Sequence, residues 1–425
     1  MKRRLNAELW DKMHYLFRDF NDRMVHVEMN YDFEIDIEAL KTVIICAFEK
    51  VPVLHSKFVD TKLSTHWEVM PYDVDEVLTV AYPENVEEAV EEFLTQYIAP
   101  DSHIQMKLAL FIKDGKSTLC MVENHMCMDG GDLKYFLKAF CENYSNYVEK
   151  GISPIEFRTG SRSYDEVYSG YSKTESGVAK RLFKNINARD KHKFPLTPNN
   201  IRDKSFIARR KLKENVLSGL KAKGKEYGAT VNEMLLAADF YSVYELAGYP
   251  ATDKVMISSA IDLRRHMDSV EDKGFTNHTA WMQCAIPERG RDIFETVKYV
   301  VRSSNRFKKD KFMGLYGLPL LNLGYNIMPH AASEEIIKIG YSNPYMAMSN
   351  IGILKGEDFA LAGNEPTDAF MSGAVKYKPY ILLTATTYKG IITLSMCVRG
   401  NEEDKKIVDK FFDLMEKNIE TLIGE

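Results

Sequence analysis

The sequence lacks long hydrophobic runs. Nowhere in its 425 residues does an apolar stretch reach the length of about 18 residues that a membrane-spanning helix requires. The N-terminal segment MKRRLNAELWDKMHYLFRDF carries charges where a secretory signal peptide needs an apolar core. We therefore expect a protein with no transmembrane segment that stays in the cytoplasm.

Closely spaced cysteine pairs are also absent. The six cysteines are scattered along the chain, at Cys46, Cys120, Cys127, Cys141, Cys284 and Cys397. Without a C-x-x-C pair, neither a disulfide framework nor a zinc site is indicated. We interpret these cysteines as reduced core residues, and we expect neither a bound metal nor a bound cofactor.

An excess of positive charge is missing as well. With 56 Lys and Arg against 61 Asp and Glu, the formal net charge is −5, which disfavours a nucleic-acid partner. Neither the G-x-G-x-x-G fingerprint nor a P-loop occurs, so enzymes built on nucleotide-binding folds are disfavoured. The composition, 45% hydrophobic and 28% charged, is that of a globular protein.

The length favours two lobes. A chain of 425 residues exceeds the size of one ordinary core. Between about 160 and 204 the hydrophobic pattern gives way to Ser, Gly, Asn, Lys and Pro, which is typical of a crossover between lobes. We place an N-terminal lobe at residues 1–175 and a C-terminal lobe at 176–425, each a mixed sheet covered by helices in a mixed α/β fold.

Two segments have a clear local pattern. Residues 37–50 place apolar side chains on one helical stripe, and residues 402–423 predict a closing helix. Residues 105–125 contain two apolar runs around KDGK, the Asp-Gly signal of a β-hairpin. The second run ends at His125, and an amphipathic helix starts right after the glycines at 130 and 131.

The joint between that strand and that helix, HMCMDGG, is the first candidate site. An imidazole has an ordinary pKa near 6.5, so His125 can be neutral and act as a general base at cellular pH. Asp129 can hold that ring directly, or brace the loop through an arginine, and the glycines let the backbone fold closely. Taken alone, His-x-x-x-Asp is a weak signal that is more typical of a structural turn than of a catalytic site.

The surrounding segments favour the catalytic interpretation. The joint resembles the H-H-x-x-x-D-G motif of the chloramphenicol acetyltransferase and condensation-domain superfamily, including its alcohol acetyltransferase branch. In chain order there follow AIDLRRHM, similar to the D-x-R strand end of that family, GFTNHTAW, similar to its G-x-x-N element, and SNIG at 349–352. The resemblance extends over roughly residues 30–423.

This resemblance implies an acyltransferase with its active site between two chloramphenicol acetyltransferase-like lobes. His125 corresponds to the catalytic base, and Asp129 to an aspartate that pairs with an arginine of the other lobe, here Arg264. Arg265 is the neighbouring candidate, and since strand neighbours face opposite ways only one of them points inward. Gly130 supports the turn.

Three further residues are expected near the cleft, with a possible role as donors to the oxyanion: Asn277, Ser349 and Asn350. The sequence departs from the family pattern at Asn124, where the family has its first histidine. Asparagine forms hydrogen bonds but does not titrate in this range. Because the resemblance assigns the chemistry to the second histidine, we still expect an active enzyme.

The resemblance also implies the partners. The acyl donor is a thioester, either acyl-coenzyme A or a phosphopantetheinyl carrier protein, and the acceptor is a small alcohol or amine. From Lys180 to Lys213 there are twelve basic residues against two acidic ones, a local excess of +10. This run is either simply solvated or a patch that attracts phosphates and carboxylates, and it fits both donors.

Three functions remain open. The first is a stand-alone acyltransferase that uses acyl-coenzyme A, which the apparent lack of a carrier or adenylation region favours. The second is a free-standing condensation enzyme that needs a loaded carrier protein. The third is a non-catalytic binding protein on the same fold, against which the presence of His125, Asp129 and Arg264 argues.

Overall fold

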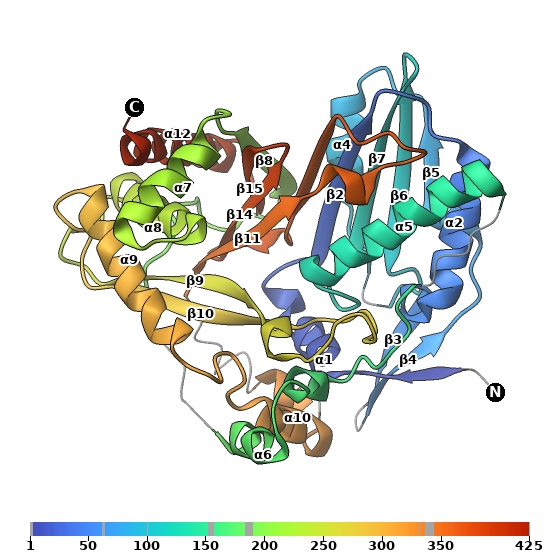
Figure 1. The fold of residues 1–425 in the computed structure, drawn as a ribbon, viewed down its shortest axis with the longest axis horizontal. Helices are drawn as coiled ribbons and strands as arrows, with labels where there is room; N and C mark the ends of the chain where they lie inside the picture. Colours follow the sequence, from blue (N-terminus) through green and yellow to red (C-terminus); the bar gives the residue numbers. More distant parts are fainter. Residues whose placement is uncertain are drawn as a thin grey trace.

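The computed structural model describes residues 3–61, 64–99, 101–151, 157–182, 190–329, 331–335 and 344–424. Two lobes lie side by side, each with a twisted sheet and helices packed on it (Figure 1). The predicted mixed α/β class with two lobes is confirmed, because both large sheets contain parallel and antiparallel neighbours.

The sheet of the first lobe has five strands in the order β12-β2-β7-β6-β5. Its strands are β2 (Met24–Tyr31), β5 (Leu78–Ala81), β6 (Met106–Lys113), β7 (Lys116–Asn124) and β12 (Asp368–Ser372). Along β6, Leu108 and Leu110 pack into one core cluster and Ala109 and Phe111 into another, as the two-residue period of a strand requires.

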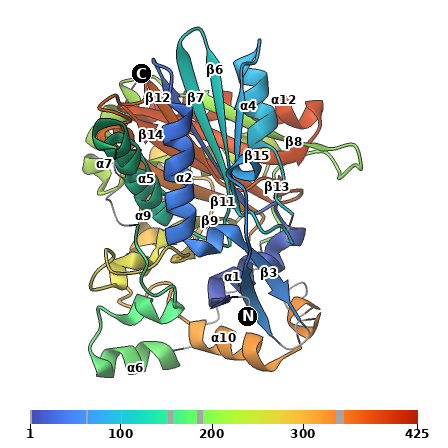
Figure 2. The same cartoon turned by 90° about the vertical axis from the view of Figure 1, so that its right-hand side faces the viewer.

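Helices cover both faces of this sheet. On one face lie α2 (Ile37–Lys50) and α5 (Gly130–Lys150), and on the other lies α4 (Val86–Leu94). Figure 2 shows α2 and α5 on one side of the β6 and β7 hairpin and α4 on the other. Because both faces of β7 are covered, the end of this strand is held in place, and His125 is the residue that follows it.

A small antiparallel sheet and several short elements accompany the first lobe. They are β1 (Arg4–Asn6), β3 (Ser56–Asp60), β4 (Thr65–Val69), α1 (Leu9–Leu16) and α3 (Val74–Val77). Near α1 lie α6 (Lys173–Arg181) and α10 (Leu318–Ile327), with which it shares an apolar cluster that includes Leu263 (Figure 1). The predicted crossover therefore contains a helix of its own.

The sheet of the second lobe follows the order β10-β9-β11-β14-β15-β13, and β8 pairs with β15. Its strands are β8 (Lys204–Lys211), β9 (Val255–Asp262), β10 (Thr279–Ile286), β11 (Met346–Leu354), β13 (Lys376–Tyr377), β14 (Ile381–Tyr388) and β15 (Ile391–Gly400). Its packed helices are α7 (Val216–Tyr227), α8 (Val231–Ala247), α9 (Ile293–Lys308) and α12 (Glu402–Ile423).

The chain crosses between the lobes more than once. Strand β12 comes from the C-terminal part of the chain but pairs antiparallel with β2 in the first-lobe sheet. It covers an edge of β2 whose backbone groups would otherwise lack a strand partner. A division at residues 175 and 176 follows most of the arrangement but leaves out this exchange, which joins the two lobes.

Local sequence signals positioned the site elements. Asp114 and Gly115 both have positive φ, 50° and 74°, as a tight two-residue hairpin turn requires. The helices predicted at 37–50 and 402–423 have these bounds in the structure. No helix in the described ranges is both long and apolar enough to cross a bilayer.

Candidate functional site

The loop from His125 to Asp129 joins β7 to α5 and is held from several directions. The backbone N–H of His125 donates to the carbonyl of Arg23 on the neighbouring segment at 2.8 Å. From behind, Arg162 donates to the carbonyls of Met126 and Cys127 at 3.5 and 3.2 Å. Arg162 is itself fixed by an ion pair with the buried Asp11 at 3.0 Å. The loop is therefore rigidly supported.

Asn124, where the family pattern has a histidine, is a structural residue of this loop. Its side chain is buried, donates to Gln105 Oε1 at 2.7 Å and accepts from the Met126 N–H at 3.2 Å. Both ends of the amide are thereby engaged within the protein. The departure from the family pattern changes the support of the loop and leaves the His125 ring in place.

The His125 ring is oriented by Asn277 of the second lobe. Its Nδ1 lies 2.8 Å from Asn277 Oδ1, and Asn277 Nδ2 donates to the His125 carbonyl at 2.7 Å. Because a carbonyl only accepts, the amide nitrogen must face it, and the amide oxygen must then face Nδ1. In the neutral ring, Nδ1 therefore carries the hydrogen, and Nε2 has a free lone pair.

Electrostatics keep His125 neutral. Burial lowers its pKa from 6.5, and this effect outweighs the opposing influence of Asp129 and Asn277. A second imidazole, His14 of α1, stacks on it with ring centroids 4.3 Å apart. Burial and the neighbouring His125 lower the pKa of His14 well below its usual value. At neutral pH both rings are uncharged.

Asp129 is a brace rather than a partner of His125. It is the N-cap of α5, accepting from the N–H groups of Gly131 and Asp132 at 2.9 and 3.0 Å. It also accepts from the second lobe, from the His278 N–H at 2.6 Å and from Thr279 Oγ1 at 3.0 Å. No hydrogen bond joins it to His125 within the described part of the chain.

Arg264 links Asp129 to the second lobe. Its two terminal nitrogens lie 2.9 and 3.1 Å from the two Asp129 oxygens, a bidentate pair. Burial raises the pKa of Asp129, but the charge and hydrogen bonds of Arg264 outweigh burial and hold the pKa well below its usual value. The structure thus brings together His125, Asp129, Arg264 and Asn277.

The two arginines of DLRR do not lie on a strand. They belong to a short 3-10 turn, Leu263–His266, directly after β9. Arg264 is buried and Arg265 is exposed, so one of them points inward, but the turn rather than strand alternation produces the difference. Arg264 also pairs with Asp132 and Asp262, each at 3.0 Å.

Of the two glycines, Gly131 is the one that the packing requires. A Cβ at Gly130 would meet no atom within 4 Å, whereas one at Gly131 would lie 2.9 Å from Arg264 Nη1 and 3.1 Å from Asp129 Oδ1. The close approach of backbone to the ion pair therefore needs glycine at 131. The sequence predicts this support at Gly130, whereas the close contacts are at Gly131.

This difference gives a matched prediction. Gly131→Ala displaces the Arg264 head and is expected to destabilise the protein by about 1–3 kcal/mol, as overpacking does. Gly130→Ala, in open space at the start of α5, is expected to be neutral or to stabilise by up to about 1 kcal/mol. Thermal unfolding of both variants measures this, and equal melting temperatures would contradict the assignment to Gly131.

Ser349 and Asn350 are not brought to His125 by any hydrogen bond among the described residues. Both lie on β11, at the point where its pairing with β14 contains a bulge. Asn350 Oδ1 accepts from the Gly352 N–H at 2.9 Å and so caps that bulge. Asn277 lies at the site, but because its Nδ2 donates to the His125 carbonyl, it orients the ring rather than serving the oxyanion.

Part of the basic run is neutralised by ion pairs. On β8 and just beyond it, four basic residues pair with acidic residues of the two lobes: Arg209 with Glu28, Arg210 with Glu416, Lys211 with Asp368, and Lys213 with Glu420. Residues 183–189 lie outside the described ranges. For β8 the structure therefore favours the solvated interpretation over an anion-binding patch.

Metal and thiol chemistry gain no support. The described residues contain no group of three His, Cys, Asp or Glu side chains suited to hold a metal ion. All six cysteines are unpaired thiols, five of them buried and Cys46 half-buried. Burial raises the pKa of the Cys127 thiol well above its usual value, so it stays protonated between the two motif residues.

Several site residues have no local sequence signal. Their roles depend on contacts between segments that are far apart in the sequence: His14 stacks on the His125 ring, Arg162 donates to the Cys127 carbonyl, and Asp132 pairs with Arg264. Asp132 carries the one hint, since it continues the motif as DGGD. Its carboxylate accepts from the Thr276 N–H at 2.8 Å and pairs with Arg158.

No family model and no curated protein matches the sequence. Solved structures do match over nearly the whole chain. The first condensation domain of the CDA synthetase has a TM-score of 0.70 at 12% identity, covering 98% of this chain and 96% of its own. The trichothecene 15-O-acetyltransferase of Fusarium sporotrichioides has a TM-score of 0.70 at 11% identity, with coverages of 98% and 95%.

A third match is the polyketide synthase associated protein 5 of Mycobacterium tuberculosis, with a TM-score of 0.66, 15% identity and coverages of 99% and 100%. At these identities the matches establish the fold. The chain has the two-lobed fold of this condensation domain and of this acetyltransferase.

Proposed function

We propose that the protein is an acyltransferase that moves an acyl group from a thioester to a hydroxyl or amine of a small acceptor. The observation that carries this proposal is the contact between His125 Nδ1 and Asn277 Oδ1 at 2.8 Å. It leaves Nε2 of a neutral imidazole as a proton acceptor at the junction of two lobes. A neutral imidazole nitrogen with a free lone pair can act as the general base of acyl transfer.

The reaction has one proton to move. His125 Nε2 takes the proton from the acceptor O–H or N–H as that atom attacks the thioester carbonyl. This attack forms the new C–O or C–N bond and gives a tetrahedral intermediate, whose collapse breaks the C–S bond. The imidazolium returns its proton to the leaving thiolate, so that the base is restored and no metal or bound cofactor takes part in the step.

The remaining site residues hold this base in position. Asp129 from the first lobe and Arg264 from the second form a bidentate pair that joins the lobes beside the loop. Asn277 fixes the tautomer, and Arg162 supports the loop carbonyls. A general base contributes to the rate only if it stays within hydrogen-bond reach of its proton, and these contacts maintain that placement.

The donor is either acyl-coenzyme A or an acyl group on a phosphopantetheinyl carrier protein. The likeness of the fold to an acetyltransferase supports the first, and its likeness to a condensation domain supports the second. We favour acyl-coenzyme A with a small alcohol or amine. A free-standing condensation enzyme that uses a loaded carrier is the second candidate.

A thiol-release assay tests the proposal. Purified protein is incubated with acyl-coenzyme A donors of several chain lengths and with mixed alcohols and amines, and free thiol and acylated product are measured together. Acceptor-dependent thiol release supports the coenzyme A reading, and release only after addition of a loaded carrier protein supports the condensation enzyme. No transfer with either donor would favour a non-catalytic binding protein.

The role of Asn277 gives a separate prediction. Asn277→Ala removes the hydrogen bond that selects the tautomer of His125, and a bond worth about 1–2 kcal/mol corresponds to a rate loss of roughly 5- to 30-fold. The loss is expected in kcat with KM little changed. Asn305→Ala, an exposed position on α9, is the control, and equal rates in both variants would contradict the role of Asn277.

A further inference from the structure

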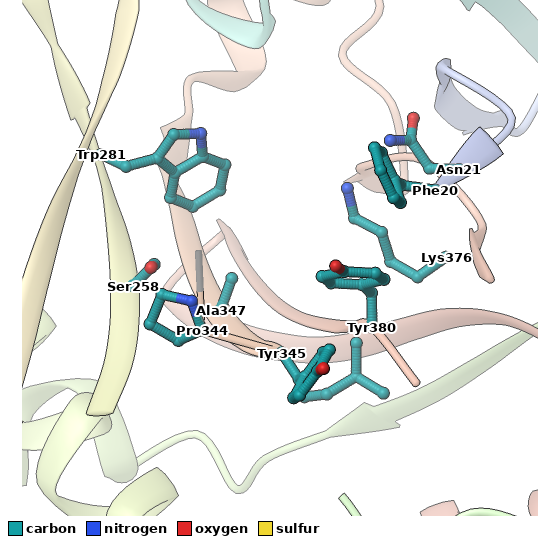
Figure 3. Close-up of a pocket in the computed structure, with 10 residues that line it drawn as sticks. Phe20, Asn21, Ser258, Trp281, Pro344, Tyr345, Ala347, Lys376 and Tyr380 are labelled. Atoms are coloured by element: carbon teal, nitrogen blue, oxygen red, sulfur yellow. The ribbon is translucent and has the colours of Figure 1, made fainter. Parts of the chain in front are cut away.

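A pocket beside the site contains a lysine that the mechanism does not use. Its walls come from both lobes and include Phe20, Asn21, Ser258, Trp281, Lys376 and Tyr380. Figure 3 shows the amine end of Lys376 reaching into the space, with the Trp281 indole on the opposite side. The pocket has a volume of about 40 Å³, which is room for a few water molecules at about 10–15 Å³ each or for one small polar group.

Two paths link the pocket to the site, one to His125 and one to Asp129. Asn21 forms a β-bridge with Lys376, and two residues further on, the Arg23 carbonyl accepts from the His125 N–H. On β10, Trp281 stands two residues from Thr279, hence on the same face and about 7 Å along the strand. Thr279 Oγ1 donates to Asp129 at 3.0 Å.

The charge of Lys376 also acts on the same ring. Its charge is among those that lower the pKa of His125 and of His14. A substrate that extends from His125 Nε2 into the pocket would therefore bring one of its groups to the Lys376 amine.

Lys376 has no counterpart of its own in the described ranges of the chain. Its Nζ forms neither a hydrogen bond nor an ion pair with any residue there. The nearby Asp22 instead accepts from the Met24 and Val375 N–H groups at 3.0 and 2.9 Å, and burial raises its pKa to about 7. A partly buried ammonium with unsatisfied donors is costly unless an anion joins it.

Lys376 is nevertheless charged at neutral pH. Burial lowers its pKa to about 8, in spite of the opposing effect of Asp22, so that the protonated form still predominates at pH 7. The pocket therefore presents one ammonium group between aromatic side chains. The ring centroids of Phe20 and Tyr345 lie 5.3 and 5.1 Å from that of Tyr380 and form an aromatic wall.

We propose that this pocket is a substrate subsite in which Lys376 binds a carboxylate carried by the small-molecule substrate on an apolar or aromatic frame. A carboxylate fits a single ammonium in a small pocket, whereas a phosphate calls for several cationic donors, and Lys376 is the one cation among the lining residues. This inference rests on the proposed function, because it assigns a substrate class to the same site.

Direct binding tests it without turnover. Benzoate and benzamide, which share one ring and differ in charge, are titrated into the wild-type protein and into Lys376→Met by calorimetry. Intrinsic fluorescence is recorded in parallel, because Trp281 is partly exposed in the pocket while Trp10 and Trp67 are buried. The control for charge removal is Lys221→Met, at an exposed position on α7.

We expect benzoate to bind the wild-type protein at least tenfold more tightly than benzamide and to quench Trp281. Lys376→Met is expected to lose this preference, while Lys376→Arg keeps part of it and Lys221→Met keeps all of it. Equal affinities of the wild-type protein for the two probes, or an unchanged preference in Lys376→Met, would overturn the proposal. The comparison of benzoate with benzamide on the wild-type protein does not depend on whether any variant folds.

Turnover then identifies which substrate carries the carboxylate. In the first pair of assays the donor is acetyl-coenzyme A, and 4-hydroxybenzoate is compared with its methyl ester as acceptor. In the second pair the acceptor is benzyl alcohol, and succinyl-coenzyme A is compared with butyryl-coenzyme A as donor. If Lys376→Met loses a preference for the acid in the first pair, the subsite binds the acceptor. If it loses a preference for the acid in the second pair, the subsite binds the acyl group. Benzoate binding without any thiol release would refute the proposed function and leave the anion site standing.

Discussion

Replacing His125 with alanine is expected to lower kcat/KM for acyl transfer by about 10²- to 10⁴-fold, the usual contribution of a general base. The reason is geometric, because His125 is the ring whose Nδ1 is held by Asn277 and whose Nε2 is left to accept a proton. Free-thiol release with one acyl-coenzyme A and one acceptor measures the loss. The melting temperatures of both proteins are measured first, and the rates are corrected for the folded fraction at the assay temperature if they differ.

A matched control separates loss of the base from loss of a histidine. His103, on a loop of the first lobe, is partly exposed. His103→Ala is expected to keep the wild-type rate. Equal thiol release from the wild-type protein and His125→Ala would refute the general-base role, even if the fold and the acyltransferase activity were both retained.

The pH profile adds an independent check on the same base. His125 acts when neutral, so the rate falls as pH drops through its pKa in the free enzyme. Burial lowers that pKa from its ordinary 6.5. The midpoint of this fall in rate is therefore expected below pH 6.5. A midpoint above 6.5 would contradict the neutral, buried state of the ring.

Features that depend on neighbouring residues were predictable from the sequence. The Asp-Gly turn required positive φ at both central residues, and Asp114 and Gly115 have it. The stripe of 37–50 became a helix because one of its faces had apolar positions at helical spacing, and that face is buried. The strand, turn and helix around His125 follow from the same local rules.

Features that depend on distant residues were not predictable in the same way. Asn277 holds the His125 ring across 152 positions, and its role became visible only when β10 was placed against the loop. The sequence offered Asn277 as an oxyanion donor because an amide can donate, but the amide is already bound to the His125 carbonyl. Composition and spacing carry no information about which donor is already satisfied.

The same limit applies to the lobes. An open edge on β2 calls for a strand partner, but nothing in the sequence specifies that β12, more than 300 residues later, supplies it. Lys376 follows that strand closely and lines a pocket together with residues of both lobes. A division of the sequence into an N-terminal and a C-terminal half therefore leaves out the exchange of β12 into the first-lobe sheet.

The second large effect is expected for Asp129→Asn, which should reduce both stability and rate. An asparagine amide turns donors toward the guanidinium of Arg264 or toward the N–H groups that Asp129 accepts from, so at least one buried donor loses its partner. Breaking a buried ion pair costs about 3–5 kcal/mol. Arg264 keeps Asp132 and Asp262, both at 3.0 Å, so we expect the lower end, about 3 kcal/mol.

Asp262→Asn is the matched control, because it removes a carboxylate from the same arginine. The Asp262 side chain is 58% exposed, whereas that of Asp129 is 3% exposed. Solvent-exposed ion pairs contribute about 0–1 kcal/mol. Thermal unfolding is expected to show a clear drop in melting temperature for Asp129→Asn and little change for Asp262→Asn, and an unchanged melting temperature for Asp129→Asn would contradict the bracing role.

The pH dependence of that difference tests its electrostatic origin. The pKa of Asp129 is held below its ordinary 3.8 in the folded protein, so its stabilising contribution is present above that value and is lost as pH falls through the lowered folded pKa. Asparagine does not titrate there. The gap in melting temperature between the wild-type protein and Asp129→Asn should therefore be largest near neutral pH and should narrow below about pH 4. A gap that is constant down to strongly acidic solution would mean that the loss arises from helix capping and packing, and that the ion pair between the lobes contributes little to holding His125 in place.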